Sequence, residues 1–179
     1  MIRTGLLLAA GASRRFGPED KLLADYAGRP LVAHAADAMR SADLDDRVAV
    51  VTSDAVAAHL QGFRVIRIEQ GQQSDSLRSG LTAIGAPDRL LIALADMPRV
   101  TAAHLDAVLN HAGDNTIAAS HDGATPLPPA CFPRAMLPAL ATLKGDQGAG
   151  RLLRDLPQDA FVRAPDLLID IDTRADLTD

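Results

Sequence analysis

The sequence has few aromatic residues and no excess of positive charge. Aromatic residues make up 3% of the 179 positions, with no Trp and one Tyr. Proteins that bind single-stranded nucleic acid often stack its bases on aromatic rings, and this chain offers few residues for that. Phosphate backbones are bound mainly by clustered Lys and Arg, whereas here 18 basic residues face 23 acidic ones and the formal net charge is -5. We therefore expect no nucleic-acid partner.

Cysteine and long apolar runs are also scarce. The one cysteine, Cys131, cannot form a disulfide within the chain, which fits a reducing compartment such as the cytoplasm. No apolar run approaches the roughly 20 residues that a membrane-spanning helix needs, so we expect no membrane insertion. The run at residues 6–12 superficially resembles a secretory signal, but it is short and Arg14 and Arg15 follow it directly. The pattern favours a soluble, cytoplasmic protein.

The chain does have a regular alternation of short apolar runs and helical patterns. Its length and its 47% share of apolar residues suit a single domain, residues 1–179, with one buried core. Apolar residues recur at helical spacing after Pro30 and after Thr101, which we expect to be a helix N-cap. The apolar runs, several rich in Val and Ile, predict strands at residues 5–10, 47–52, 64–68, 89–95, 115–119, 160–162 and 167–171.

This alternation predicts an α/β fold with an open, mostly parallel sheet covered by helices on both faces, a three-layer αβα arrangement. Ligands of such sheets bind beyond the carboxyl ends of the strands. The four prolines of residues 121–133 break the alternation and predict a loop or an irregular antiparallel excursion. Two further helices are expected around residues 134–143 and 148–156, with a turn between them.

The strongest local pattern is a buried strand that enters a loop of small residues at positions 7–21. Small side chains let backbone N–H groups approach a phosphate, and Ser13 adds a hydroxyl donor. Arg14, Arg15 and Lys21 add positive charge at a spacing that suits a triphosphate. The alternative is a plain strand-to-helix turn with solvated arginines, which the clustering of three cations makes less attractive.

Two well-known glycine loops do not match this segment. The Walker A pattern needs Gly-Lys-Ser/Thr, but Gly17 is followed by Pro18 and the lysine comes only at position 21. The dinucleotide fingerprint needs closely spaced glycines, but after Gly11 the next one is Gly17. The loop is therefore of another kind.

Residues 8–21 resemble the signature Leu-Ala-Ala/Gly-Gly-x-Ser-x-Arg-Met-Gly-x-x-Lys of the molybdopterin nucleotidyltransferase family, within the glycosyltransferase-A-like nucleotidyltransferases. Residues 74–81, 94–98 and 170–173 match later family segments, so the resemblance runs along almost the full chain. Phe16 replaces the usual Met, and the spacer before the final Lys is one residue longer than in the signature. The resemblance implies a Rossmann-like fold and nucleotide transfer.

Within that family, the chain looks like the cytidylyltransferase branch, which makes molybdopterin cytosine dinucleotide. Residues 101–105 and 145–149 carry this likeness, and the Ala-Ala-Gly form of residues 9–11 favours it over the guanylyltransferase branch. Two features depart from the pattern. Gly150 stands where an Arg is common, and Pro128-Pro129 stands where a His-Pro pair is often found near the acceptor site.

The carboxylates predict a site for Mg²⁺, which favours a few carboxylates together with substrate phosphates. Asp96 closes the apolar run 90–95, so its side chain is expected at the carboxyl end of a buried strand. Asp170 and Asp172 would share one face of an extended segment, and like charges there favour a nearby cation. We choose Asp96 and Asp172 as metal ligands. The alternatives are that loop amides satisfy Asp96 and that Asp170 or Asp172 caps a helix near Thr173.

The resemblance also assigns roles to single residues. Ser76 matches the position that hydrogen-bonds the nucleobase, although its segment also reads as a helix start with Ser74 as the N-cap. His104 would help to select the base, or would be an ordinary helical histidine. We place acceptor recognition in residues 121–133. The implied nucleotide-binding set is Leu8, Ala9, Ala10, Gly11, Ser13, Arg14, Arg15, Lys21, Ser76 and Gly80; Lys21, Arg15 and Asp96 are catalytic; Pro98, His104 and Asp146 select base or acceptor.

The leading hypothesis is therefore transfer of CMP from CTP to the phosphate of molybdopterin, with Mg²⁺ as cofactor and release of pyrophosphate. A molybdoenzyme or a maturation factor is a candidate partner. A second hypothesis keeps the donor site but uses GTP, or a sugar or alcohol phosphate as acceptor. A third, of another class, is a non-catalytic carrier of the pterin cofactor; it would need no metal carboxylates.

Overall fold

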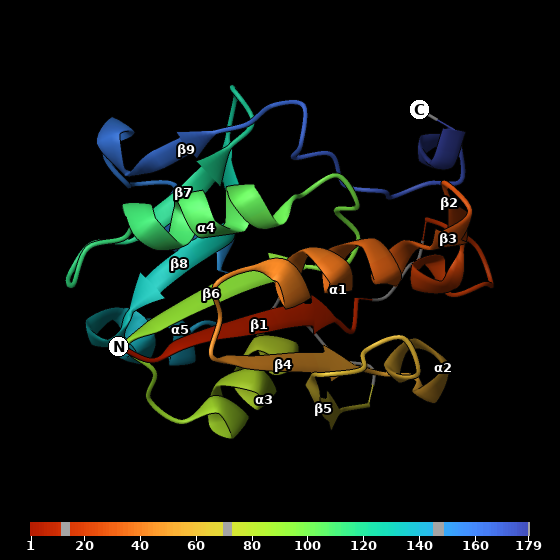
Figure 1. The fold of residues 1–179 in the computed structure, drawn as a ribbon, viewed down its shortest axis with the longest axis horizontal. Coiled ribbons are helices and arrows are strands. Elements are labelled where there is room, and N and C mark those ends of the chain that lie inside the picture. Colours follow the sequence, from red (N-terminus) through yellow and green to blue (C-terminus); the bar gives the residue numbers. More distant parts are fainter. Residues whose placement is uncertain (12–14, 70–72, 145–148, 179) are drawn as a thin grey trace.

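The computed structural model describes residues 1–11, 15–69, 73–144 and 149–178. Within these residues, seven strands form one sheet in the order β5-β4-β1-β6-β8-β7-β9 (Figure 1). Strand β8 runs antiparallel to both of its neighbours, and the other pairs in the sheet are parallel. Strands β2 and β3 form a separate hairpin. The predicted α/β fold with a mostly parallel sheet is confirmed.

The strands are β1 (Arg3–Ala9), β2 (Asp25–Tyr26), β3 (Arg29–Pro30), β4 (Asp46–Val51), β5 (Arg64–Arg67), β6 (Arg89–Leu94), β7 (Ala118–His121), β8 (Pro126–Pro133) and β9 (Phe161–Arg163). The α-helices are α1 (Leu31–Ser41), α2 (Asp54–Ala57), α3 (Gln73–Ile84), α4 (Ala102–His111), α5 (Leu137–Ala141) and α6 (Gly150–Leu153). Short 3-10 helices are η1 (Lys21–Leu23), η2 (Arg134–Met136), η3 (Gln158–Ala160) and η4 (Ala175–Thr178).

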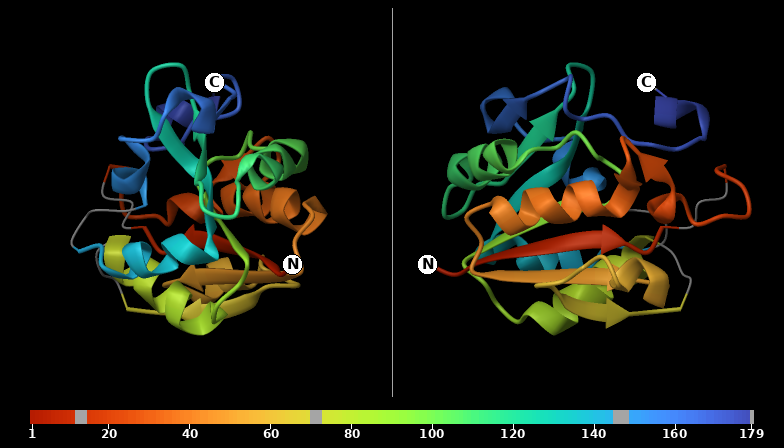
Figure 2. Two further views of the ribbon diagram at one scale, coloured as in Figure 1. Left: turned by 90° about the vertical axis from the view of Figure 1, so that its left-hand side faces the viewer. Right: turned by 45° about the vertical axis from the view of Figure 1, so that its right-hand side comes forward.

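Helices cover both faces of the sheet and make it the middle of three layers (Figure 2). Leu7 of β1 lies in one apolar cluster with Met39 of α1 and residues of α4. Its neighbour Leu6 lies in the other cluster with Leu77 of α3 and residues of α5 and α6. Successive side chains of a strand point to opposite faces, so a strand covered on both sides is apolar throughout. This is why the central runs of the sequence show no polar alternation.

The local signals at helix starts and at the proline-rich segment are largely confirmed. Thr101 caps α4, because its side chain accepts a hydrogen bond from the backbone N–H of His104 at 3.2 Å. The proline-rich segment forms the antiparallel strand β8, which enters the sheet between two strands that run the other way. Ser74 was expected to be an N-cap, but α3 begins at Gln73, so Ser74 lies inside its first turn.

Three expected elements differ in the structure. Residues 167–171 form no strand. The N–H of Ile171 donates a hydrogen bond to the Asp96 carbonyl, but this is a single contact beyond the end of β6 and not a ladder of hydrogen bonds. Strand β7 begins at Ala118 and not at residue 115, because the N–H of Gly113 bonds to the Thr116 carbonyl and hydroxyl in a turn. The late helices are shorter than expected and are split between η2, α5 and α6.

No helix within the described ranges has both the length and the apolar character that crossing a membrane requires. The carboxyl ends of the parallel strands β1, β4 and β6 meet at one edge of the sheet. The C-terminal segment crosses to this edge after β9 and ends beside the β2–β3 hairpin (Figures 1 and 2). The edge therefore gathers segments from both ends of the chain.

Candidate active site

Lys21 lies at the centre of a charged cluster at this edge. It is the first residue of η1, whose N-cap Asp20 accepts from the N–H of Leu22 at 3.0 Å and so fixes where the lysine side chain leaves the backbone. Its Nζ lies 2.8 Å from Oδ2 of Asp96 and 3.4 Å from Oδ1 of Asp172. The Lys21 side chain is 10% exposed, so this ammonium group exchanges much of its water for two carboxylates.

Asp96 reaches the cluster from the end of a buried strand. It follows β6 by two residues, and the preceding Ala95 donates its N–H to the Leu8 carbonyl, which extends the contact between β6 and β1. One carboxylate oxygen, Oδ2, binds Lys21. The other, Oδ1, is buried and has no hydrogen-bond partner among the described residues. A buried carboxylate oxygen without a donor is costly unless a cation or a ligand group binds it.

Asp172 brings the C-terminal segment to the same place. Its carboxylate pairs with Lys21 and, through Oδ2, with Nη2 of Arg15 at 2.7 Å. The backbone N–H groups of Asp172 and Thr173 bind the carboxylate of Asp176 instead, at 3.0 and 2.6 Å. The Asp172 side chain therefore faces the cluster and does not cap the last helix. Asp170, its partner in the predicted pair, is exposed.

The electrostatics of the cluster follow from these contacts. Burial alone lowers the pKa of Lys21, but the nearby Asp96 and Asp172 carboxylates outweigh it, and the pKa is raised above its ordinary value. Asp170 is exposed at the surface, but the neighbouring chain removes part of its hydration, and this loss, followed by the negative charges of Asp172 and Asp96, raises its pKa. Three carboxylates thus lie close enough to affect one another, and Lys21 and Arg15 neutralise part of their charge. Such a cluster attracts further cations.

The predicted nucleotide loop begins directly beside this cluster. Ala9 and Ala10 are buried, Leu8 is partly buried, and Gly11 is exposed. A Cβ atom built on Gly11 would meet nothing within 4 Å, so the backbone there opens into free space. This is the environment that a backbone cradle for phosphate needs. Ser13 and Arg14 were also assigned to this loop and lie outside the described residues.

Two contacts that the sequence reasoning missed attach the loop to the C-terminal segment. Nη2 of Arg174 lies 2.7 Å from Oε2 of Glu19. The Arg174 guanidinium also lies over the ring of Phe16, 5.4 Å from its centroid, and Phe16 is 2% exposed. The replacement of the usual Met by an aromatic ring was visible in the sequence, but the arginine that covers it was not.

The two predicted residues on α3 lie in different surroundings. Ser76, the predicted base ligand, is 5% exposed and lies in the first turns of the helix. Gly80 is packed against the sheet, because a Cβ there would lie 2.7 Å from Cδ1 of Leu6 and 3.2 Å from Cγ2 of Val50. The described contacts thus give Gly80 a packing role beneath the helix.

Two of the predicted base and acceptor residues, Pro98 and His104, have no hydrogen bond or ion pair to the charged cluster among the described residues. Pro98 is buried two residues beyond Asp96. His104 is buried on α4, and its Nε2 lies 2.8 Å from Oγ of Ser120 on β7. Burial lowers the pKa of His104. Asp146 lies outside the described residues.

The cluster fits a divalent cation by the chemistry of its donors. Asp96 and Asp172 face one another across Lys21, and the buried Oδ1 of Asp96 has no donor within the described chain. Among these residues, no group of three or more His, Cys, Asp or Glu side chains forms a full metal cage. Mg²⁺ rarely uses such a cage and takes its remaining ligands from water and substrate phosphates. Two carboxylates can therefore be enough to hold this ion.

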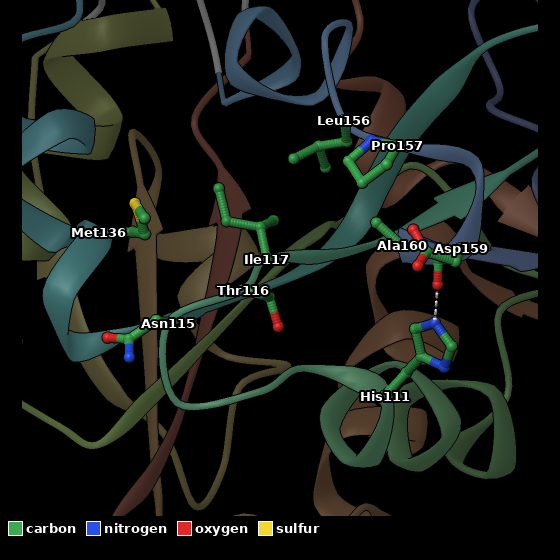
Figure 3. A pocket seen from close by; sticks show the side chains of 9 residues that line it. All are labelled: His111, Asn115, Thr116, Ile117, Met136, Leu156, Pro157, Asp159 and Ala160. Carbon is green, nitrogen blue, oxygen red and sulfur yellow. Dashed lines mark hydrogen bonds between the residues drawn. The ribbon is translucent and has the colours of Figure 1, made fainter.

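A cavity of about 280 Å³ lies at the opposite edge of the sheet (Figure 3). Apolar side chains such as Ile117, Met136 and Leu156 line it, and His111 at its rim contacts the backbone carbonyl of Asp159 at 2.5 Å. Residue 117 immediately precedes β7, which runs parallel to β6, so the cavity adjoins the amino ends of these strands. None of the predicted site residues lines this cavity in the described part of the chain.

Comparison with known proteins identifies the class. The family model described as the MobA-like NTP transferase domain matches residues 5–160. The chain belongs to this family, and it is a nucleotidyltransferase.

Several relatives share most of the chain's length. It is 30% identical to nicotine blue oxidoreductase of Paenarthrobacter nicotinovorans, with 86% of this chain and 82% of that protein covered. It is 31% identical to the purine catabolism protein PucB of Bacillus subtilis (strain 168), with 94% and 91% covered. A probable molybdenum cofactor guanylyltransferase of Natronomonas pharaonis is also 31% identical, with 73% of this chain and 64% of that protein covered.

Among solved structures, Rv0371c of Mycobacterium tuberculosis H37Rv has a TM-score of 0.85 at 27% identity, with 99% of this chain and 97% of that chain covered. The same protein in complex with manganese gives a TM-score of 0.81 at 26% identity, with 99% and 97% covered. The predicted Rossmann-like αβα fold is therefore confirmed.

Proposed function

We propose that this nucleotidyltransferase moves CMP from CTP to the phosphate of a molybdopterin-type acceptor, with Mg²⁺ as its cofactor, in the cytoplasm. The observation that carries the proposal is the position of Lys21, whose ammonium group joins Asp96 and Asp172 at the edge of the sheet where the open backbone of Gly11 follows β1. In the reaction, an acceptor phosphate oxygen forms a bond to the α-phosphorus of CTP. The bond from that phosphorus to the bridging oxygen breaks, and pyrophosphate leaves.

The residues of this chain would share the binding of the triphosphate. Lys21 and Arg15 would neutralise its negative charge, and the backbone at Gly11 would approach it closely. Ser76 would bind the base through its hydroxyl. An acceptor phosphate is already largely ionised at pH 7, so its attack needs little help from a general base.

Asp96 and Asp172 would hold the metal ion. When bound, Mg²⁺ supplies positive charge that offsets the charge developing on the α-phosphate oxygens. The buried Oδ1 of Asp96, which has no hydrogen-bond partner in the part of the chain that the structure describes, supports this assignment. The manganese complex of Rv0371c supports a divalent ion in a related protein.

A second candidate is the same chemistry with GTP. Its support is the relative of Natronomonas pharaonis, which is named as a molybdenum cofactor guanylyltransferase. Residues 101–105 and the Ala-Ala-Gly form of residues 9–11 favour CTP. Thermal stabilisation by the four nucleoside triphosphates in turn, each with Mg²⁺, separates these two candidates, because a ligand of the folded state raises the melting temperature.

Pyrophosphate release tests the proposal directly. With CTP, Mg²⁺ and molybdopterin, we expect turnover by the wild type and a loss of about 100-fold in Asp96→Asn, because the metal would lose a charged ligand. Asp114→Asn is the matched control, because that carboxylate is 90% exposed and pairs with Arg89. Full activity in Asp96→Asn would overturn the metal assignment. Pyrophosphate release with GTP but not with CTP would show that GTP is the donor.

A further inference from the structure

Two successive buried hydrogen bonds link α4 to the sheet. The hydroxyl of Ser120 on β7 donates to the carbonyl oxygen of Pro129 at 2.7 Å, and Nε2 of His104 lies 2.8 Å from the same hydroxyl. Ser120 is 0% exposed and His104 is 6% exposed. Buried polar groups that lose water need partners, and these three groups satisfy one another.

The direction of these hydrogen bonds determines which nitrogen of the His104 ring carries a hydrogen. A serine hydroxyl has one proton, and Ser120 gives it to Pro129. The hydroxyl must then accept from His104, so Nε2 of the imidazole carries the hydrogen. Burial lowers the pKa of His104, which keeps the ring neutral at pH 7. The ring therefore acts as a fixed donor inside the core.

The Pro129 carbonyl, which accepts the second of these hydrogen bonds, belongs to an irregularity in β8. Ala119 of β7 faces Ala130, but the next residue, Ser120, faces Leu127. Pro128 and Pro129 are therefore extra residues in β8, and they form a bulge. Proline has no N–H to give to a ladder, so the position of this bulge depends on bonds to its carbonyl oxygens.

The bulge lies beside the catalytic end of β6. The pairing of β6 with β8 reaches Ile92 and Ala130. Because the two strands are antiparallel, residues 129 and 128 continue towards the end of β6 that leads to Asp96. Strand β6 continues from Ile92 to Leu94 and Asp96 follows two residues later, so the bulge and Asp96 lie towards the same end of these two strands.

The order of the strands then decides which substrate meets the bulge. The nucleotide loop follows β1, Asp96 follows β6, and β8 lies on the far side of β6. A group that attacks a nucleotide held on the β1 side, in line with the leaving pyrophosphate, must come from the other side of Asp96. That is the side of β8.

We propose that His104 and Ser120 are positioning residues, which hold the Pro128-Pro129 bulge in place as a wall of the acceptor site. They act through the Pro129 carbonyl and do not contact the nucleotide. This inference rests on the proposed function, because it needs an acceptor that attacks from the β8 side.

The test separates the two substrates of the reaction. Ser120→Ala leaves the His104 N–H and the Pro129 carbonyl buried without partners. We expect the KM for molybdopterin to rise about ten-fold, while the KM for CTP stays within about two-fold. Ser120→Thr keeps a hydroxyl and should restore the KM for the acceptor. His111→Gln alters an exposed histidine of the same helix and should change neither value.

An equal rise in both KM values, no rise at all, or failure of Ser120→Thr to rescue would overturn the inference. Absence of pyrophosphate from the wild type with every triphosphate and acceptor would instead refute the proposed function. Amide hydrogen exchange tests the positioning role without any measurement of activity. We expect Ser120→Ala to speed amide exchange at Leu127 and Ala130 but not at Ala9, and unchanged exchange at both would contradict it.

Discussion

At the scale of single residues, Lys21 explains how carboxylates that repel one another share one site. Its ammonium group lies within 3.4 Å of both Asp96 and Asp172. Such a group lowers the repulsion between the carboxylates before substrate binds, and in the proposed function it would bind phosphate once a metal ion occupied the carboxylates. The cluster is therefore organised in advance.

Removing this charge should destabilise the protein. We expect Lys21→Met to lower the free energy of unfolding by about 2 kcal/mol, because two partly buried carboxylates lose their cation. The pKa of Lys21 is raised from its ordinary value of 10.5, so its contribution is complete below that pH and is lost as the pH rises through the higher folded value. Urea unfolding with a metal chelator measures the difference.

The matched control is Lys144→Met, because Lys144 is exposed. The difference between wild type and Lys21→Met should be constant from about pH 7 to 9 and shrink above 10.5. A difference that grows with pH, or an equal loss in the control, would contradict the account of Lys21.

Cys131 should be chemically inert in the folded protein. It lies buried in β8, and burial raises its pKa to about 12. Because the thiolate is the reactive form, we expect a thiol reagent at about pH 8 to react with the native protein about a thousand-fold more slowly than with the unfolded chain. Absorbance of the released thiol product measures both rates, and rapid labelling of the native protein would show that β8 is exposed.

At the scale of elements, most strands and the main helices could be predicted, because buried strands and amphipathic helices leave clear periodic patterns. Residues 167–171 were misread because burial makes a segment apolar whether or not it pairs. Leu168 and Ile171 are buried, yet the segment is not a strand. Strand β8 was recognised only as an excursion, since prolines normally exclude a segment from the inside of a sheet.

Gly80 shows how closely α3 packs on β1. A Cβ there would lie 2.7 Å from the side chain of Leu6, which is 0% exposed. We expect Gly80→Ala to lower the free energy of unfolding by about 1 kcal/mol, because overpacking outweighs the gain in helix propensity. The control is Gly150→Ala in α6, where a Cβ would meet nothing within 4 Å and stability should not fall. Urea unfolding compares the two, and a more stable Gly80→Ala variant would show that α3 can shift.

At the scale of the whole molecule, the site joins segments that are far apart in the chain. Arg15 and Asp172 are 157 positions apart and yet form an ion pair. The position of Asp96 after a buried strand, together with the family resemblance, predicted that Lys21, Asp96 and Asp172 share one site. The strand argument for Asp172 was wrong, because residues 167–171 form no strand. Neither the lysine bridge nor the contact of Arg174 with Glu19 and Phe16 was predicted, since no local pattern encodes which side chains the C-terminal segment brings back.

In the proposed function, Asp96 and Asp172 form a divalent-metal site beside the loop that follows β1. The most direct test is Mn²⁺ binding in the presence of CTP, followed by electron paramagnetic resonance. Wild type and Asp114→Asn should bind the ion alike, and Asp96→Asn and Asp172→Asn should each bind it at least about ten-fold more weakly, because each removes one charged ligand. Wild-type affinity in Asp96→Asn would contradict the account.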